Sequence, residues 1–241
     1  MAILITGVGA CGHKSTNVEQ IPEPVQVVEI DTTHHGLIIY YPPTDSIELR
    51  CFDRPDPAVD SSIVFCCAAA FTADWKTDPD HSRICGDHVS AGQLYKRPKM
   101  KRNTGAFIAK DSTYRFLYSY KADPTYYRNF FEKVTTAFTQ EMMIHQMEKV
   151  KTTRPDNNYN QFRALCLTNG GRLCIAESTR SIPFGTFIQM LLNAGMYDAL
   201  YLDMGPGWNY SWYREYAGGD ATYIHSATLG SATNWLVFHK F

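Results

Sequence analysis

The chain has 241 residues, of which 44% are hydrophobic and 20% charged, and 23 basic residues nearly balance 24 acidic ones for a net charge of −1. This composition excludes a disordered, collagen-like or coiled-coil protein, and the length fits one large domain or two small ones. The balanced charge argues against a general nucleic-acid binder, and no apolar run approaches the roughly 18 residues of a membrane-spanning helix.

The chain begins with a short apolar run that ends in Val8-Gly9-Ala10-Cys11. This run resembles the lipobox of bacterial lipoproteins, whose cysteine is lipidated and becomes the mature first residue. It is shorter than such signals and lacks a basic start, which a start codon assigned too far downstream would explain. We expect residues 1–24 to be a signal remnant and linker, Cys11 a lipid anchor, and the protein periplasmic or at the cell surface. The alternative is a buried first strand.

Residues 25–241 read as a single domain rich in strands. Residues 25–30 and 37–41 are β-branched and aromatic, and the polar residues between them predict a hairpin. Residues 47–52 form another candidate strand, and the continuous apolar run at 62–70 predicts a strand covered on both faces. Three further hairpins are predicted by short polar turns between apolar runs, at residues 84–95, 106–118 and 164–176.

Two segments predict helices. Residues 124–151 have helical spacing with a break near 135–136, followed by a strand at 142–144. A clearer helix follows Ser181, a predicted N-cap, has one apolar face and ends at Gly195. A short strand at 199–202 then leads to Asp203. We therefore predict an α+β fold, with a mixed, mostly antiparallel sheet and one or two packed helices.

The segment Leu202-Asp203-Met204-Gly205-Pro206-Gly207, with the preceding helix end, resembles the "LDGGgS" signature of phosphodiester glycosidases, the relatives of the lysosomal uncovering enzyme. The hairpin that starts at Arg163 and the strand at 65–75 match other family elements in order, and the resemblance covers roughly residues 60–215. Two departures stand out. The asparagine of the family's Asn-Gly-Gly-Phe-Phe is replaced by small residues in the segment Ala68-Ala69-Ala70-Phe71-Thr72-Ala73-Asp74. Met204 and Pro206 interrupt the glycine loop.

The resemblance implies hydrolysis of a sugar-1-phosphodiester, a reaction that needs a carboxylate to stabilise an oxocarbenium-like centre. Asp203 is the first candidate for that carboxylate. Such reactions often use a second carboxyl group for proton transfer, and Glu177 is the candidate for it. The structural alternatives are an Asp203 side chain that caps its own loop and a Glu177 side chain that complements the helix dipole. Arg163 matches the family arginine and would grip phosphate, although a surface ion pair would explain it equally well.

The remaining predicted substrate-binding residues come from several loops. They are Asp74, His88, Gly205, Gly207, Trp208, Asn209 and Ser211. The aromatic run that follows Asp203 suits a sugar-binding rim, and core packing is the alternative. A lone histidine such as His88 is more often structural than catalytic.

The cysteines show no CxxC pair and no zinc spacing, so we expect no structural metal and no cofactor. A divalent-metal hydrolase built from Asp203, Asp74 and His88 is a weaker alternative. Two readings of function follow. The first is an exported glycosidase-like hydrolase that acts on a sugar phosphodiester or related glycosidic bond, with a glycan or sugar-phosphate ligand and no nucleic acid. The second is a non-catalytic carbohydrate-binding surface lipoprotein with a degenerate active site.

Overall fold

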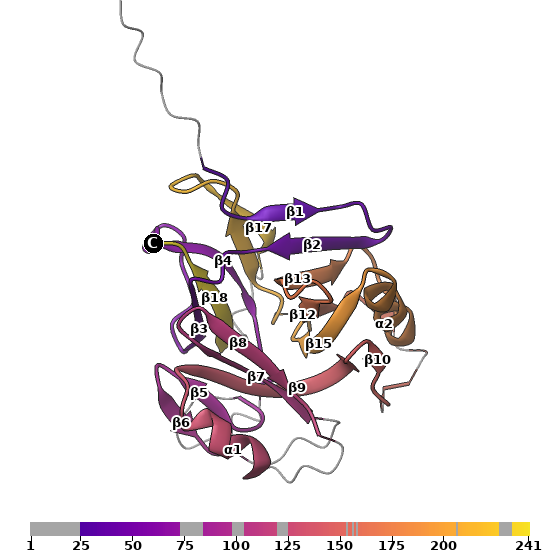
Figure 1. The fold of residues 1–241 in the computed structure, drawn as a ribbon. Helices are drawn as coiled ribbons and strands as arrows, with labels where there is room; N and C mark the ends of the chain where they lie inside the picture. Colours follow the sequence, from indigo (N-terminus) through magenta and orange to yellow (C-terminus); the bar gives the residue numbers. More distant parts are fainter. Residues whose placement is uncertain are drawn as a thin grey trace, which may run out of the picture.

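The computed structural model describes residues 25–72, 84–97, 104–119, 125–152, 154–155, 157, 159–205, 207–226 and 233–241. Two β-sheets account for most of this part of the chain (Figure 1). The larger sheet has the order β1-β2-β13-β12-β15-β9-β5-β6. Strands β7 and β10 also pair with β9, and β8 pairs with β7. The smaller sheet has the order β17-β16-β4-β18-β3. Every pairing between these strands is antiparallel.

The strands of the larger sheet are β1 (Glu29–Asp31), β2 (Leu37–Tyr41), β5 (His88–Ser90), β6 (Gln93–Tyr95), β7 (Thr104–Lys110), β8 (Thr113–Leu117), β9 (Thr136–His145), β10 (Glu148–Lys149), β12 (Arg163–Thr168), β13 (Leu173–Ser178) and β15 (Met196–Leu202). Those of the smaller sheet are β3 (Ser46–Cys51), β4 (Ile63–Ala68), β16 (Ser211–Arg214), β17 (Ala221–His225) and β18 (Asn234–His239). Two short strands, β11 (Tyr159–Asn160) and β14 (Ile182–Pro183), pair with each other.

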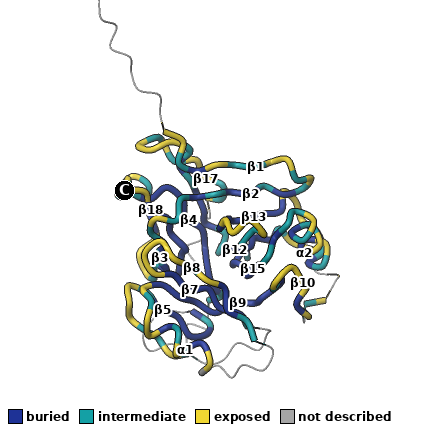
Figure 2. The backbone as a smooth tube through the Cα atoms, in the orientation of Figure 1, coloured by how far each residue is buried: buried dark blue, intermediate teal, exposed yellow. Residues whose placement is uncertain are grey.

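The main core lies between the two sheets. Leu49, Phe65 and Leu236 of the smaller sheet pack in one cluster with Leu165 and Leu200 of the larger one, and all five are fully buried. The tube in Figure 2 shows this interior as buried backbone running through both sheets. The two sheets are therefore held together chiefly by apolar burial.

Strand β4 is covered on both faces, as its continuous apolar run predicts. All six of its residues are buried. Cys67 faces the core between the sheets, whereas Cys66 packs on the outer face with Trp212 and Trp235. Adjacent strand residues point to opposite faces, which explains how neighbouring cysteines enter different clusters.

The α+β prediction is wrong. In the described part of the chain the only helices are α1 (Thr125–Phe131) and α2 (Phe184–Asn193), so the fold is mostly antiparallel β. The helical spacing at 124–151 gave a wrong prediction, because this segment contains the short helix α1 and then the ten-residue strand β9. Nearly every β9 residue is buried, and its bulky side chains mimic a helical stripe.

Helix α2 is present but begins later than its predicted cap. Ser181 lies before β14, and Pro183 is the residue that precedes the helix, without a side-chain cap. Its buried face consists of Phe184, Phe187, Ile188 and Leu191, which pack on the outer face of the larger sheet. Gly195 ends it as predicted, with φ at +77°, a conformation that glycine adopts without strain.

The C-terminal strand β18 was not predicted, and it closes the smaller sheet between β4 and β3. Its first residue, Asn234, is buried, and its side-chain amide clamps the backbone that follows β4. Asn234 Oδ1 accepts from the Ala70 N–H at 2.7 Å, and Nδ2 donates to the Ala70 carbonyl at 3.1 Å. This clamp fixes the end of β4 next to the segment that β15 reaches.

Asn234→Ala should lower the free energy of unfolding by about 2–4 kcal/mol, because it leaves two buried backbone groups of Ala70 without partners. Urea denaturation measures this change. Asn193→Ala, at an exposed position at the end of α2, is the control and should change stability by less than about 0.5 kcal/mol. Equal effects of the two substitutions would refute the clamp.

Candidate functional site

Asp203 lies where the two sheets meet. It follows Leu202, the last residue of β15, and Leu202 is paired with Arg163 of β12. The Asp203 N–H donates to the carbonyl of Ala69 at 2.9 Å, so the end of β15 is tied to the end of β4 in the other sheet. This junction brings three predicted segments together: the loop after Asp203, the β12–β13 hairpin and the strand that ends near Phe71.

The Asp203 side chain is 8% exposed, and burial raises its pKa to about 6. Backbone N–H groups of Gly205 and Met204 and the charges of Arg154 and Arg163 oppose this rise by favouring the carboxylate. The predicted capped turn exists, since the Gly205 N–H donates to Asp203 Oδ1 at 3.2 Å. Asp203 is therefore both a loop cap and a desolvated carboxylate whose pKa is raised to about 6.

Arg163 and Glu177 form a buried ion pair across the β12–β13 hairpin, where they are directly opposite each other. Arg163 Nε donates to Glu177 Oε2 at 2.9 Å, and its side chain is fully buried. Arg163 also donates to Ser211 Oγ at 2.7 Å, which joins the pair to the smaller sheet. In this arrangement Arg163 holds other side chains and has no exposed surface for phosphate.

His225 and Asn209 complete this network. His225, directly across from Ser211 in the β16–β17 pairing, contacts the second Glu177 oxygen through Nε2. Its Nδ1 lies 3.4 Å from the Asn209 side-chain amide. Burial favours the neutral form of Glu177, but Arg163 and His225 outweigh it and hold the pKa of Glu177 below its ordinary value. Glu177 is thus ionised at neutral pH and has no proton to donate.

The glycine loop after Asp203 folds over the junction. The Trp208 N–H donates to the Gly205 carbonyl at 2.8 Å, and the Trp208 indole donates to Thr72 Oγ1 at 3.0 Å. A Cβ on Gly205 would lie 3.3 Å from the Trp208 ring, so only glycine allows this approach without adjustment. Gly207 has φ at +84°. Both glycines therefore serve the shape of the loop.

Several predicted site residues lie elsewhere. His88 belongs to β5, which β9 separates from β15, and its ring stacks on Tyr95 at 4.9 Å between centroids. Of the aromatic run after Asp203, Tyr210 and Trp212 are buried in the outer core of the smaller sheet and donate to the Pro55 carbonyl. They form core rather than a sugar-binding rim. Asp74, Cys11 and the whole 1–24 segment lie outside the described residues.

Sequence reasoning missed three residues of the site: His225, Asn234 and Arg154. The first two belong to the C-terminal strands, where the apolar run Trp235-Leu236-Val237-Phe238 was a usable strand signal. Arg154 lies in a polar loop with no pattern to mark it. Its guanidinium stacks over Tyr201, two residues before Asp203.

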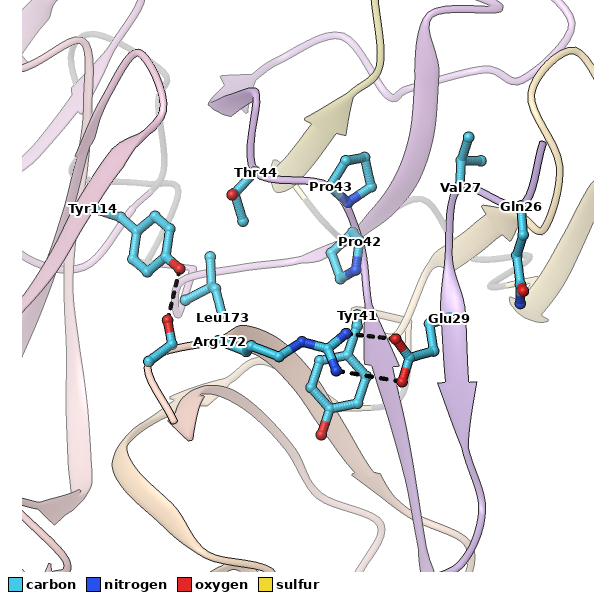
Figure 3. A pocket seen from close by; sticks show the side chains of 11 residues that line it. Gln26, Val27, Glu29, Tyr41, Pro42, Pro43, Thr44, Tyr114, Arg172 and Leu173 are labelled. Atoms are coloured by element: carbon cyan, nitrogen blue, oxygen red, sulfur yellow. Dashed lines mark hydrogen bonds and ion pairs between the residues drawn. The ribbon is translucent and has the colours of Figure 1, made fainter. Parts of the chain in front are cut away.

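A separate hollow of about 530 Å³ lies at the opposite, turn end of the β12–β13 hairpin (Figure 3). Arg172 there pairs with Glu29 at 2.6 Å, and its guanidinium covers the Tyr41 ring at 3.9 Å. Tyr114 donates to the Gly171 carbonyl across the hollow. No residue predicted for the site lines this hollow, and its charged groups pair with each other.

Within the described ranges, no three His, Cys, Asp or Glu side chains gather as metal ligands would. No helix in the same part of the chain is long and apolar enough to cross a membrane.

Solved structures show the same architecture. The catalytic domain of zebrafish N-acetylglucosamine-1-phosphodiester alpha-N-acetylglucosaminidase, auto-inhibited by its pro-peptide, is similar with a TM-score of 0.60 and 12% identity, over 92% of this chain and 85% of that one. A hypothetical protein from Synechocystis is similar with a TM-score of 0.52 and 12% identity, over 88% of this chain and 61% of that one. The three chains share a fold. No protein-family profile and no curated sequence matches the chain.

Arg163→Met should lower the free energy of unfolding by about 3–5 kcal/mol, because it leaves the Glu177 carboxylate buried without its main partner. Chemical denaturation measures the loss. Arg172→Met is the matched control, since the Arg172–Glu29 pair is more than half exposed and should contribute less than about 1 kcal/mol. A small loss for Arg163→Met would contradict a buried ion pair.

Asp203→Asn should stabilise the protein at pH 8 by up to about 3 kcal/mol, at roughly 1.4 kcal/mol for each pH unit of pKa shift. Because the folded-state pKa is raised from 3.8 to about 6, the contribution of Asp203 to stability is full below pH 3.8 and is lost as pH rises through 6. Thermal unfolding at several pH values measures the difference, which should vanish in acid.

Asp31→Asn is the control of opposite sign. Hydrogen bonds from Thr33 lower the pKa of Asp31, so its contribution is present at neutral pH and is lost as pH falls. Asp31→Asn should therefore never stabilise the protein at pH 8. A stability gain for Asp203→Asn that does not change with pH would show that Asp203 titrates normally.

Proposed function

We propose that this protein is a glycosidase-like hydrolase that cleaves a sugar phosphodiester or a related glycosidic bond. The observation that carries the proposal is Asp203, a desolvated carboxylate with a pKa of about 6, at the junction of the two sheets. It is supported by the fold shared with a glycosidase catalytic domain and by the sequence resemblance around Asp203. Perturbed carboxylates at such junctions are typical of functional sites.

In this proposal the bond between the anomeric carbon and the phosphate oxygen breaks, and water supplies the hydroxyl of the released sugar. The ionised Asp203 stabilises the positive charge that develops on the anomeric carbon. Phosphate is a good leaving group, so strong protonation is not required. The ionised Glu177 holds Arg163 and His225 in place and acts as a positioning residue rather than as the acid that its sequence position suggested.

The alternative is a carbohydrate-binding protein that kept the fold without turnover. One observation favours it: the family's asparagine motif is replaced by Ala68, Ala69 and Ala70, whose buried side chains offer no polar group. The two functions share the Asp203 junction and differ in whether a glycan bond is cleaved. Export through a lipidated Cys11 is a further part of the proposal, and it rests on the sequence of the first residues alone.

Purified protein should release sugar from at least one member of a panel of nucleotide sugars and sugar-1-phosphodiesters. Asp203→Asn should reduce this release about 100-fold or more, since it removes a charge used in the transition state. The rate should rise with pH through about 6, as Asp203 ionises. Asp198→Asn, a buried carboxylate of the same strand that pairs with His145, is the control and should retain activity.

Absence of release from the whole panel, together with glycan binding that survives, would replace the hydrolase with the binding protein. Equal losses for Asp203→Asn and Asp198→Asn would remove Asp203 from the chemistry.

A further inference from the structure

Arg154 lies beside Asp203 in a cage of aromatic rings. The centre of its guanidinium is 4.2 Å from the Tyr201 ring centroid, 4.6 Å from that of Phe184 and 5.5 Å from that of Phe71. The side chain is only 9% exposed. Flat rings hold a guanidinium plane in a fixed orientation and favour its charge, so the position of Arg154 is set before any ligand arrives.

One edge of this guanidinium is already paired. Arg154 Nε donates to Glu141 Oε2 at 2.8 Å, and Thr152 donates to the other Glu141 oxygen at 3.0 Å. The outer end of the fork is different. Arg154 Nη2, which shares that end with Nη1, is buried and makes no hydrogen bond of normal geometry to a described residue. A buried N–H group without an acceptor is costly, and such groups in native proteins usually await a ligand or an ordered water.

Arg154 lies close to Asp203 along the chain that leaves β15. Its guanidinium covers the ring of Tyr201, and Asp203, two residues later, directly follows the last residue of that strand. The charge of Arg154 stabilises the Asp203 carboxylate more than that of Arg163 does. Arg163 also has a buried nitrogen, Nη1, without a hydrogen-bond partner in the described part of the chain. Its side chain is 0% exposed, against 9% for Arg154, and is engaged with Glu177 and Ser211, so it is less accessible to a ligand.

We propose that Arg154 binds an oxyanion of the substrate through Nη2 and thereby sets a preference for phosphodiesters over neutral glycosides. The proposal rests on the proposed function in placing the substrate at Asp203. An oxyanion held at Nη2 would satisfy the buried N–H. The outer end of the arginine fork thus selects the substrate, and Nε fixes the fork on Glu141.

The test variant is Arg154→Lys. Lysine keeps the positive charge opposite Glu141, so the buried carboxylate stays paired, but it lacks the planar guanidinium fork and its outer N–H groups. Arg128→Lys is the matched control, because Arg128 of α1 also pairs through Nε with a buried carboxylate, that of Asp87, just before β5. Thermal unfolding of both variants shows whether they fold like the wild type.

The first measurement is the affinity for dimethyl phosphate, a monoanionic diester, by NMR titration, with acetate as the carboxylate probe. Arg154→Lys should weaken phosphate binding about tenfold to hundredfold, the range expected for a charge-assisted hydrogen bond. Arg128→Lys should bind like the wild type. Unchanged affinity in Arg154→Lys, or an equal loss in Arg128→Lys, would overturn the proposal. Stronger binding of acetate than of the diester would assign the Arg154 site to a carboxylate ligand and would also overturn the proposal.

The second measurement separates this inference from the function. It compares kcat/KM for a sugar phosphodiester with kcat/KM for a neutral aryl glycoside of the same sugar. Arg154→Lys should lower the ratio at least about tenfold through the phosphodiester alone. An active enzyme whose ratio does not change would refute the role of Arg154 and leave the hydrolase standing. A wild type without turnover that still loses phosphate binding in Arg154→Lys would refute the hydrolase and retain the anion site.

Discussion

The buried ion pair between Arg163 and Glu177 is the interaction on which the meeting of the two sheets depends. The pair belongs to the larger sheet, yet its remaining hydrogen bonds go to Ser211 and His225 of the smaller one. Apolar burial between the sheets is non-directional and would tolerate small slips. Buried charged groups do not tolerate such slips, because each must keep its hydrogen-bond partners. The pair therefore fixes one relative position of the sheets. The backbone hydrogen bond from Asp203 to Ala69 forms only in that position.

The consequence is that the Asp203 carboxylate occupies a buried position that lowers the stability of the fold at neutral pH. Asp203 loses hydration when the ends of β15 and β4 come together, and the neighbouring N–H groups and arginines compensate only in part. A raised pKa of this kind costs folding free energy at neutral pH. Proteins retain such costs mostly where the group has a task, and an arginine with a buried N–H that lacks an acceptor lies in the same place. The two features together support the proposal that the junction is the functional site.

Local patterns predicted much of this fold. Polar turns between apolar runs located the hairpins, and Gly195 located the end of α2, because these signals depend on neighbouring residues. The prediction failed where the structure of a segment depends on pairing with strands that are distant in sequence. The helical stripe at 124–151 includes a strand that is buried on both faces, and no local signal separates the two. The C-terminal strands were missed, and with them the smaller sheet as a unit.

The same limit applies to the site. Asp203 was predicted from a resemblance in the neighbouring sequence and Glu177 from its place at the end of a predicted hairpin strand. The pairing of Glu177 with Arg163 follows from the hairpin register. His225 and Arg154 could not be found in this way, because neither lies in a segment with a recognisable catalytic or binding motif. The aromatic run after Asp203 suggested a sugar platform, but strand alternation sends Tyr210 and Trp212 into the outer core.

The account makes one claim above the others: that the junction of the sheets desolvates Asp203. The direct measurement is the pKa of that carboxyl group, followed by the 13C chemical shift of its carboxyl carbon as a function of pH, with Asp203→Asn used to assign the signal. The account predicts a midpoint of about 6. A midpoint at or below the ordinary value of 3.8 would show that Asp203 is solvated and merely caps its loop, and the functional centre placed here would be wrong.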